Sequence, residues 1–315
     1  MRSILLAQNS WILRFGELGL KSRPVRRAFQ KALRRNLEQL ALNSNTPMIH
    51  ELIRQQEIIS SSAPIADVED LLCHILGVVA IDRVVLLCQE VTPSAVAKSY
   101  LSRDENVGKA RTFGVRVRRV GENKEWNSQS FAGAVGAAML AEDDSLSVNL
   151  REPDNWVKLI MENDRVSLVE ERVSGAGGLP AGVQGDVLVQ VKNRDDMLGA
   201  FLIMRRGTRL IPVLDCDETY IEMLSKFDPF IGSRSHAKDE IGKKIQRPAW
   251  GVLGLTKEQA APFVQKRIDS VKTTPLSTLE PLCGWTEEEK IALLNHMEKP
   301  SINLSHPDLI SWIDS

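Results

Sequence analysis

Residues 187–214 read VLVQVKNRDDMLGAFLIMRRGTRLIPVL, and this stretch decides the fold class of the last third of the chain. Residues 187–191 form a short and mostly apolar run, which is typical of a buried strand. Residues 195–206 repeat apolar side chains at helical spacing, and residues 210–214 form a second apolar run. A strand, a helix and another strand in this order predict a parallel sheet.

Glycines mark the N-terminal limit of this α/β unit. Residues 174–182 read SGAGGLPAG, in which the glycines free the backbone and Pro180 restrains it at one point. Downstream, residues 250–255 predict a further strand. Two later helices are predicted to begin at capping boxes, in which a threonine and a Gln or Glu three residues later cap each other. The two boxes are Thr256 with Gln259 and Thr286 with Glu289.

The middle of the chain mixes helical and strand patterns and begins near Pro64. In residues 111–118, Phe113, Val115 and Val117 alternate with glycine or arginine, so this predicted strand has one apolar and one cationic face. Residues 128–140 predict a helix rich in glycine and alanine. Further strands are predicted at residues 146–150, 156–161 and 166–169.

The N-terminal segment combines a short predicted strand at residues 11–15 with a helix that begins at Pro24. Apolar residues recur at helical spacing along one face of this helix, and the opposite face is basic. Residues 1–40 contain nine basic and two acidic residues, whereas the whole chain has 40 Lys and Arg against 41 Asp and Glu. Since the net charge is −1, only this uneven distribution points to a polyanionic partner.

Both basic segments are rich in arginine, whose planar guanidinium can bind a phosphate through two hydrogen bonds. A solvated protein surface normally mixes charges of both signs, so segments with one sign favour nucleic-acid binding over a purely solubilising role. The predicted RNA-binding residues are Lys21, Arg23, Arg26, Arg27, Lys31, Arg34, Lys109, Arg111, Arg116, Arg118 and Arg119.

The cysteines and histidines show no familiar ligand pattern. The four cysteines, at positions 73, 88, 216 and 283, contain no Cys-x-x-Cys pair, and the five histidines lack metal-ligand spacing, so we expect no metal site. A reducing, cytoplasmic setting is the simplest expectation. No apolar run approaches the roughly 18 residues that a membrane-spanning helix needs, so we expect no membrane partner.

Several stretches, read together, resemble the tRNA 4-thiouridine synthetase (ThiI) family. Residues 14–21, RFGELGLK, with the basic helix, resemble the family's N-terminal ferredoxin-like domain. Residues 111–119, RTFGVRVRR, and residues 148–154, VNLREPD, resemble its THUMP domain. Residues 177–180, GGLP, followed by the predicted strand and by residues 202–207, LIMRRG, are similar to the start of its PP-loop domain.

The resemblance implies an α/β and α+β multi-domain chain. Its expected parts are a ferredoxin-like region at residues 1–62, a THUMP RNA-binding domain at residues 63–172, a linker at residues 173–184 and a PP-loop (adenine nucleotide alpha hydrolase-like) parallel-sheet domain at residues 185–315. It also implies that the first two parts bind the acceptor arm of tRNA. Active members of the family then adenylate uridine 8 and replace its oxygen by sulfur.

The PP-loop itself departs from the family pattern. A Ser-Gly-Gly-x-Asp-Ser turn binds ATP because its glycines have no side chains, so that backbone N–H groups at a helix N-terminus can donate hydrogen bonds to the phosphates. Here residues 191–197 read VKNRDDM, so both glycines are missing and only Asp195 survives from the motif. The side chain of Asn193 would occupy the space of a phosphate, and Asp196 would add a negative charge beside it. We therefore expect no ATP cofactor at the degenerate loop Lys192, Asn193, Arg194, Asp195 and Asp196.

Two further catalytic elements of the family are missing. The family's Gly-Glu-Asn signature is replaced by residues 253–256, LGLT, and no cysteine follows Cys283 to take part in sulfur transfer. Cys216 is a weak catalytic candidate, because the acidic residues around it disfavour a thiolate. Asp195 is the other weak candidate.

The sequence therefore predicts a tRNA-binding protein without catalytic activity that serves as an adapter for a separate tRNA-modifying enzyme. Two alternatives stay open. One is a divergent, ATP-dependent tRNA sulfurtransferase, and the other is a protein-interaction module without an RNA role. The sequence predicts no oligomeric state.

Overall fold

The computed structural model describes residues 9–16, 22–53, 56–121, 125–238, 244–246, 249–256, 258–262 and 277–302. The chain forms two compact units. Unit 1 consists of Met1–Ile12, Ile49–Ser62 and Asp82–Arg172, and unit 2 of Leu13–Met48, Ala63–Ile81 and Val173–Ser315. The domain boundaries predicted from the sequence stay a prediction.

The first six elements follow the chain order of a ferredoxin-like region, βαββαβ. They are β1 (Asn9–Arg14), α1 (Arg23–Asn43), β2 (Ile49–Ile53), β3 (Gln56–Ser61), α2 (Ile65–His74) and β4 (Ala80–Cys88). Their strands lie side by side in the order β2-β3-β1-β4. β3 pairs antiparallel with both β1 and β2.

Helix α1 buries the apolar face that the sequence pattern predicts. Ser22 precedes the helix, and Pro24 lies in its first turn, where it breaks no hydrogen bond. Phe29, Leu33, Leu37 and Leu40 are buried, together with Asn36. The cationic residues of the helix therefore lie on its outward side.

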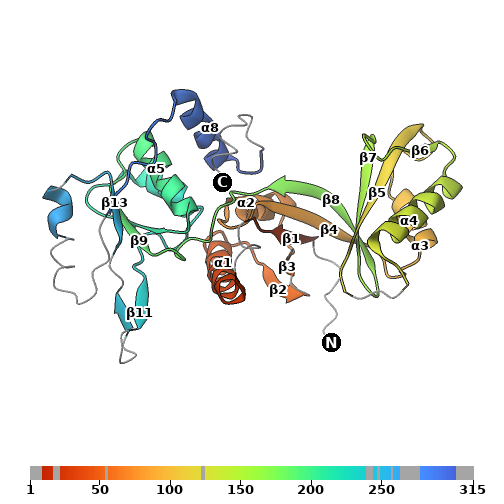
Figure 1. Cartoon of the computed structure of the whole chain (residues 1–315), viewed down its shortest axis with the longest axis horizontal. Coiled ribbons are helices and arrows are strands. Elements are labelled where there is room, and N and C mark those ends of the chain that lie inside the picture. The colour runs from red at the N-terminus through yellow and green to blue at the C-terminus, as the bar shows by residue number, and fades with distance from the viewer. Residues whose placement is uncertain are drawn as a thin grey trace. The chain divides into compact units, whose positions relative to one another are not determined.

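The next six elements extend the same sheet and cover part of one of its faces. They are α3 (Pro93–Leu101), β5 (Arg111–Arg119), α4 (Ser128–Glu142), β6 (Leu146–Val148), β7 (Asn155–Met161) and β8 (Val166–Ser174). The eight strands lie in the order β2-β3-β1-β4-β8-β7-β5-β6, and β5 is parallel to both of its neighbours. α3 and α4 lie together on one face of β5 and β7 (Figure 1). The core beneath them includes Phe113, Phe131 and Leu159.

Unit 2 contains the parallel sheet that residues 187–214 predict. Its elements are β9 (Asp186–Val189), α5 (Arg194–Arg205), β10 (Arg209–Pro212), α6 (Glu218–Ser225), β13 (Gly251–Leu253), β14 (Ser277–Thr278) and α8 (Glu287–Glu298). The strands lie in the order β10-β9-β13-β14, and every pair is parallel. A separate antiparallel pair is formed by β11 (His236–Lys238) and β12 (Lys244–Gln246).

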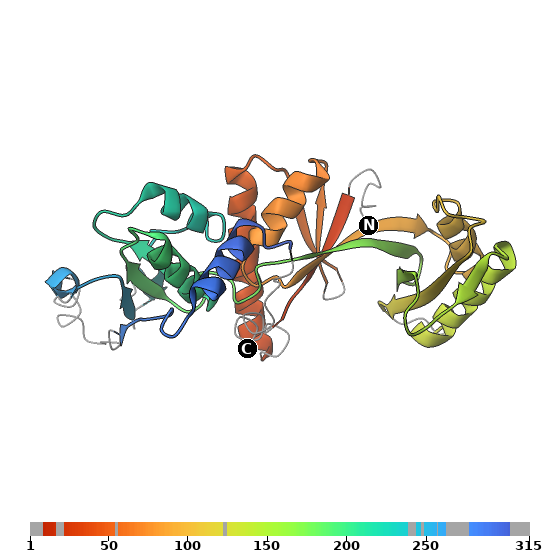
Figure 2. The same ribbon diagram turned by 90° about the horizontal axis from the view of Figure 1, so that it is seen from above.

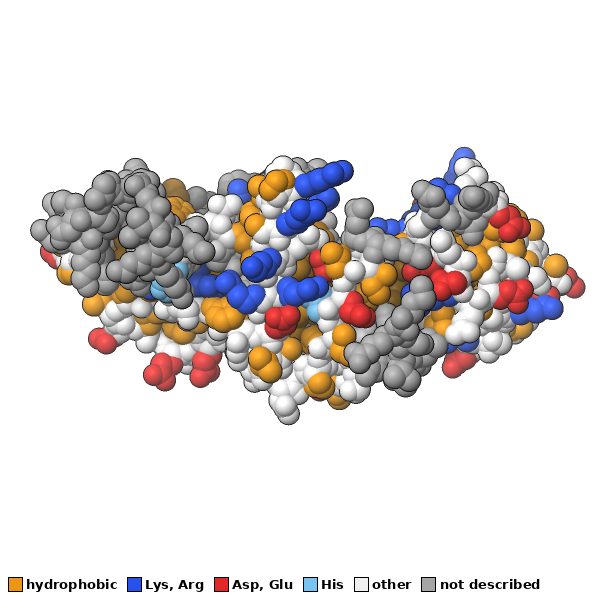
Figure 3. Space-filling view, turned by 90° about the horizontal axis from the view of Figure 1, so that it is seen from below, with side chains coloured by type: hydrophobic (Ala, Val, Ile, Leu, Met, Phe, Trp, Pro, Cys, Tyr) orange, Lys and Arg blue, Asp and Glu red, His pale blue; other side chains and the backbone are white. Residues whose placement is uncertain are grey.

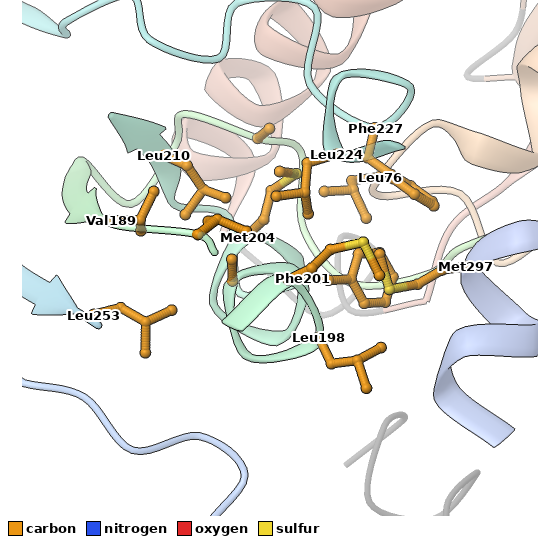
Figure 4. Close-up of a cluster of buried hydrophobic side chains, with 14 of the residues drawn as sticks. Leu76, Val189, Leu198, Phe201, Met204, Leu210, Leu224, Phe227, Leu253 and Met297 are labelled. Atoms are coloured by element: carbon orange, nitrogen blue, oxygen red, sulfur yellow. The ribbon is translucent and has the colours of Figure 1, made fainter. Parts of the chain in front are cut away.

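Helix α5 is the centre of the core of unit 2. Leu198, Phe201 and Met204 on α5 pack against strand residues such as Val189 and Leu210 (Figure 4). The rings of Phe201 and Phe227 lie 4.7 Å apart between centroids. α8 lies beside α5 in both ribbon views (Figures 1 and 2) and contributes Leu293 and Met297 to this core.

The glycine-rich residues 174–182 are packed within unit 2. Gly178 has a φ of 69°, and a Cβ there would lie 2.3 Å from the carbonyl oxygen of Arg205, so only glycine fits. Asn36 Nδ2 on α1 donates to the carbonyl oxygen of Ala181 at 3.1 Å, and Arg205 Nε donates to that of Ala176 at 2.6 Å. These contacts hold the segment between α1 and α5.

The predicted fold class is confirmed as a mixed α/β chain with a separate parallel-sheet domain. Both predicted capping boxes are also confirmed, because Thr286 and Glu289, like Thr256 and Gln259, exchange hydrogen bonds. Among the described residues, no helix combines the length and apolarity that crossing a lipid bilayer requires.

Candidate nucleic-acid interface and PP-loop site

The outward face of α1 carries exposed cations that have no carboxylate partner among the described residues. Arg23, Arg27, Lys31 and Arg34 are exposed, and Arg26 is half-buried. None of these five residues forms an ion pair with another residue that the structure describes. Lys and Arg side chains gather in a row over this helix (Figure 3). Lys21, the remaining predicted cation of this segment, lies outside the described residues.

A groove of about 520 Å³ runs beside α1 and has a cationic wall. Lys31, Arg34 and Arg35 line it, opposite Gly182 and Val183. The guanidinium of Arg35 lies 5.0 Å from the centre of the Phe230 ring, and that of Arg209 lies 5.1 Å from the same centre. Burial, and then the nearby charge of Arg209, lower the pKa of Arg35. Arg35 is absent from the predicted RNA-binding set, although its place in the basic run could have indicated it.

The outer face of β5 carries the second set of cations. Arg116 and Arg118 are exposed, whereas Phe113 on the opposite face is buried. Arg116 stacks its guanidinium on Trp156 of β7, 3.8 Å from the ring centre. Trp156 lies opposite Gly114 in the parallel register, where any Cβ would come within 2.5 Å of the ring. The tryptophan therefore holds Arg116 in one orientation while the N–H edge of the guanidinium stays available.

Three other predicted cations near β5 already have internal partners. Arg111 forms an ion pair with Asp104, and its side chain is only 14% exposed. The RNA-binding role of Arg111 stays a prediction, and in this structure its charge is paired. Lys109 Nζ donates to Asn106 Oδ1 at 2.9 Å but is exposed. Arg119 is exposed and donates to the carbonyl oxygen of Trp126 at 3.3 Å.

At the place of the PP-loop, the protein's own side chains occupy the backbone N–H groups. Asn193 is the N-cap of α5, and its Oδ1 accepts a hydrogen bond from Asp196 N at 3.0 Å. Asp196 Oδ2 in turn accepts from Lys192 N at 2.9 Å. A phosphate at a helix N-terminus needs such N–H groups. Asn193 and Asp196 thus accept hydrogen bonds from two backbone N–H groups around the start of α5.

Asp195, which the sequence resemblance aligns with the PP-loop motif, pairs with two cations. Lys290 Nζ of α8 lies 2.5 Å from Asp195 Oδ2, and Arg194 Nη2 lies 3.0 Å from Oδ1. Arg194 also pairs with Glu287 at 2.5 Å. The hydrogen bond from Lys290 is the largest effect that lowers the pKa of Asp195. The retained carboxylate therefore stabilises the contact between α5 and α8.

Cys216 lies beyond β10, at the carboxyl ends of the parallel strands. Its Sγ accepts a hydrogen bond from Val191 N at 3.4 Å and lies 3.6 Å from the carbonyl oxygen of Val213. The side chain is half-buried and packs against the core of unit 2. Its catalytic role stays a prediction.

One cluster among the described residues has the composition of a metal site. Donor atoms of Asp70, Cys73 and His74 lie within 4.8 Å of one another. Cys-x-x-Cys pairs and widely spaced histidines do not indicate this cluster, because its three residues share one helical turn. Burial raises the pKa of the Cys73 thiol to about 12.

The family model of the THUMP domain matches residues 90–169. A probable tRNA sulfurtransferase of Methanosarcina mazei is 30% identical over 226 residues, which cover 69% of this chain and 54% of the relative. A tRNA sulfurtransferase of Sodalis glossinidius is 31% identical over 202 residues, which cover 62% of this chain and 41% of the relative. The chain spans about half the length of the curated relatives that it matches.

Two solved structures share the fold. PH1313 from Pyrococcus horikoshii superposes with a TM-score of 0.68 at 22% identity, over 92% of this chain and 99% of PH1313. A 4-thiouridine synthetase in complex with RNA and bound ATP superposes with a TM-score of 0.62 at 18% identity, over 98% of this chain and 94% of that one. The fold expected from the sequence resemblance, including the THUMP domain, is confirmed.

Proposed function

The chain is a ThiI-like protein that contains a THUMP domain, and from this premise we propose that it binds structured tRNA without binding ATP. Its role would be that of an adapter that presents tRNA to a separate modifying enzyme. The acceptor arm is the proposed partner region, by analogy with the family. The observation that carries the proposal is the contrast between two sets of exposed cations and residues 191–197, where Asn193 and Asp196 accept hydrogen bonds from two backbone N–H groups.

The cations on α1 support phosphate binding because they are exposed and form no ion pair with the part of the chain that the structure describes. Arg27, Lys31 and Arg34 follow one side of the helix. A folded RNA presents phosphates of fixed spacing, and proteins recognise it largely through shape and backbone contacts. An ordered row of cations on a rigid helix matches such a target, because the helix backbone needs no reordering on binding.

The outer face of β5 supports RNA binding in a second way. The stack of Arg116 on Trp156 orients the guanidinium before any ligand arrives. A planar guanidinium held by an aromatic ring can bind a phosphate through two hydrogen bonds. Arg118 lies two residues further along the same face and adds a second positive charge.

The degenerate PP-loop supports the absence of ATP binding. A nucleotide would have to displace Asn193 Oδ1 and Asp196 Oδ2 from the backbone N–H groups that they occupy. It would also meet the negative charge of Asp196. At 4 Å and an effective dielectric constant of 20, repulsion between two unit charges costs about 4 kcal/mol. The residual Asp195 is already paired with Lys290.

The RNA-binding part is tested by reversing charges on α1. The double variant Arg27→Glu, Lys31→Glu is expected to weaken tRNA binding. It should also reduce the slope of the logarithm of the association constant against the logarithm of salt concentration by about one for each changed residue. The matched control is Lys226→Glu with Lys299→Glu, because both of these lysines are exposed on other helix ends. Equal tRNA affinity of the two double variants would contradict the proposed surface.

The nucleotide part is tested by calorimetric titration of the full chain with ATP and Mg²⁺, with and without tRNA. We expect no heat of binding at millimolar ATP. A measured ATP affinity, together with adenylation or thiolation of tRNA, would replace this proposal with the divergent sulfurtransferase. Recovery of a protein partner from cells without any RNA would favour the protein-interaction module.

A further inference from the structure

Three metal-binding side chains converge at the C-terminal end of α2, apart from the surfaces described above. Asp70, Cys73 and His74 are related as i, i+3 and i+4 on this helix. His74 Nδ1 lies 3.5 Å from Cys73 Sγ and 3.7 Å from Asp70 Oδ1. Donor atoms around one tetrahedral zinc ion lie about 3.3–3.8 Å apart, given its usual bond lengths. Both measured separations therefore fit a single ion.

A backbone carbonyl now accepts hydrogen bonds from two of these groups. Asp70 O lies 2.6 Å from His74 Nδ1 and 3.1 Å from Cys73 Sγ, so the imidazole N–H and the thiol S–H both donate to it. A divalent ion would take the place of these two hydrogens. The thiol would release its proton to solvent as the sulfur–metal bond forms, and the neutral imidazole would carry its hydrogen on Nε2.

The site is open to solvent at Asp70 and buried at Cys73 and His74. The side chain of Asp70 is 74% exposed, whereas Cys73 and His74 are buried. Asp70 and His74 also line a pocket of about 760 Å³ between the ends of α1 and α6. An ion can therefore enter past the carboxylate, and a water molecule in the pocket can complete its coordination.

We propose that Asp70, Cys73 and His74 bind a divalent transition-metal ion of the zinc type through a carboxylate oxygen, a thiolate and an imidazole nitrogen. Sulfur and nitrogen donors select zinc-like ions over Mg²⁺ and Ca²⁺, which prefer oxygen ligands. All three ligands belong to unit 2 and lie on one helical turn. The site is independent of the proposed tRNA binding.

The test is a titration of the full chain with Co²⁺, a spectroscopic substitute for Zn²⁺, after removal of metals with EDTA. The starting protein carries Cys283→Ser, which removes the exposed thiol. We expect the visible bands of tetrahedral Co²⁺ and a thiolate-to-metal charge-transfer band in the near ultraviolet. Adding Cys73→Ser is expected to abolish the charge-transfer band.

A second pair of variants keeps the test informative if Cys73→Ser fails to fold. Asp70→Asn changes an exposed side chain and is expected to weaken Co²⁺ binding at least about tenfold. Asp67→Asn is the matched control, because Asp67 is exposed on the same helix and lines the same pocket. Absence of the bands, a charge-transfer band that survives Cys73→Ser, or equal affinities of the two aspartate variants would overturn the site.

Discussion

Lowering the pH from 7 to 5 is expected to destabilise unit 2 through His296, a residue of α8 in the core around α5. The histidine is only 6% exposed and lies 6.2 Å from the Phe201 ring, measured between ring centroids. Neither ring nitrogen has a hydrogen-bond partner of normal geometry among the described residues. Burial, and then the positive charge of Arg205, lower the pKa of His296 to about 4.

The magnitude follows from the difference between the folded and unfolded pKa. The ordinary value for histidine is 6.5, so the unfolded chain binds a proton as the pH falls below 6.5 while the folded chain resists it down to about 4. Each pH unit in this window costs about 1.4 kcal/mol of folding free energy. The loss reaches about 2 kcal/mol at pH 5 and about 3 kcal/mol below pH 4. Above pH 7 the effect vanishes.

The assay is urea unfolding at pH 7 and pH 5, in EDTA, of the wild type and of His296→Leu. Leucine has a similar volume and cannot be protonated, so the variant should lose about 2 kcal/mol less than the wild type between the two pH values. His236→Leu is the control, because His236 is exposed. Parallel pH profiles of the wild type and His296→Leu would refute the reasoning. A smaller loss of unfolding free energy in His296→Leu would also identify α8 as an acid-sensitive helix. The same helix contains Lys290, the partner of Asp195.

Further predictions concern one ion pair, one stacked tryptophan and one helix cap. Arg209→Ala leaves Asp228 buried without its partner, and urea unfolding is expected to show a loss of about 3–5 kcal/mol. Asp228→Asn with Arg209→Met should recover part of that loss. Trp156→Ala is expected to weaken tRNA binding, measured by fluorescence anisotropy, and Arg116→Ala added to it should have a smaller effect than Arg116→Ala alone. Thr286→Ala removes the cap of α8 and should cost about 1 kcal/mol in thermal unfolding, whereas Thr286→Ser should cost little.

The elements that sequence predicts well are those whose signals are local. The two apolar runs on either side of residues 195–206 sufficed for the parallel pair β9 and β10. Thr286 and Glu289 lie three residues apart, so their capping box could be predicted from spacing alone. The basic face of α1 also follows from helical periodicity.

The features that sequence missed depend on contacts between distant residues. Lys290 lies 95 residues from Asp195, so nothing local indicates that this lysine pairs with the carboxylate. Trp156 reaches Arg116 only because the parallel register of β5 and β7 places it opposite Gly114. The ion pair between Arg111 and Asp104 is a further contact that the composition of the basic segment does not indicate.

The salt dependence of tRNA affinity tests the central claim most directly. If the exposed cations Arg23, Arg27, Lys31, Arg34, Arg116 and Arg118 each contact one phosphate, a plot of the logarithm of the association constant against the logarithm of salt concentration should have a slope of about −4 to −5. Saturating ATP should leave this line unchanged. A slope near zero, or an affinity that requires ATP, would contradict the account.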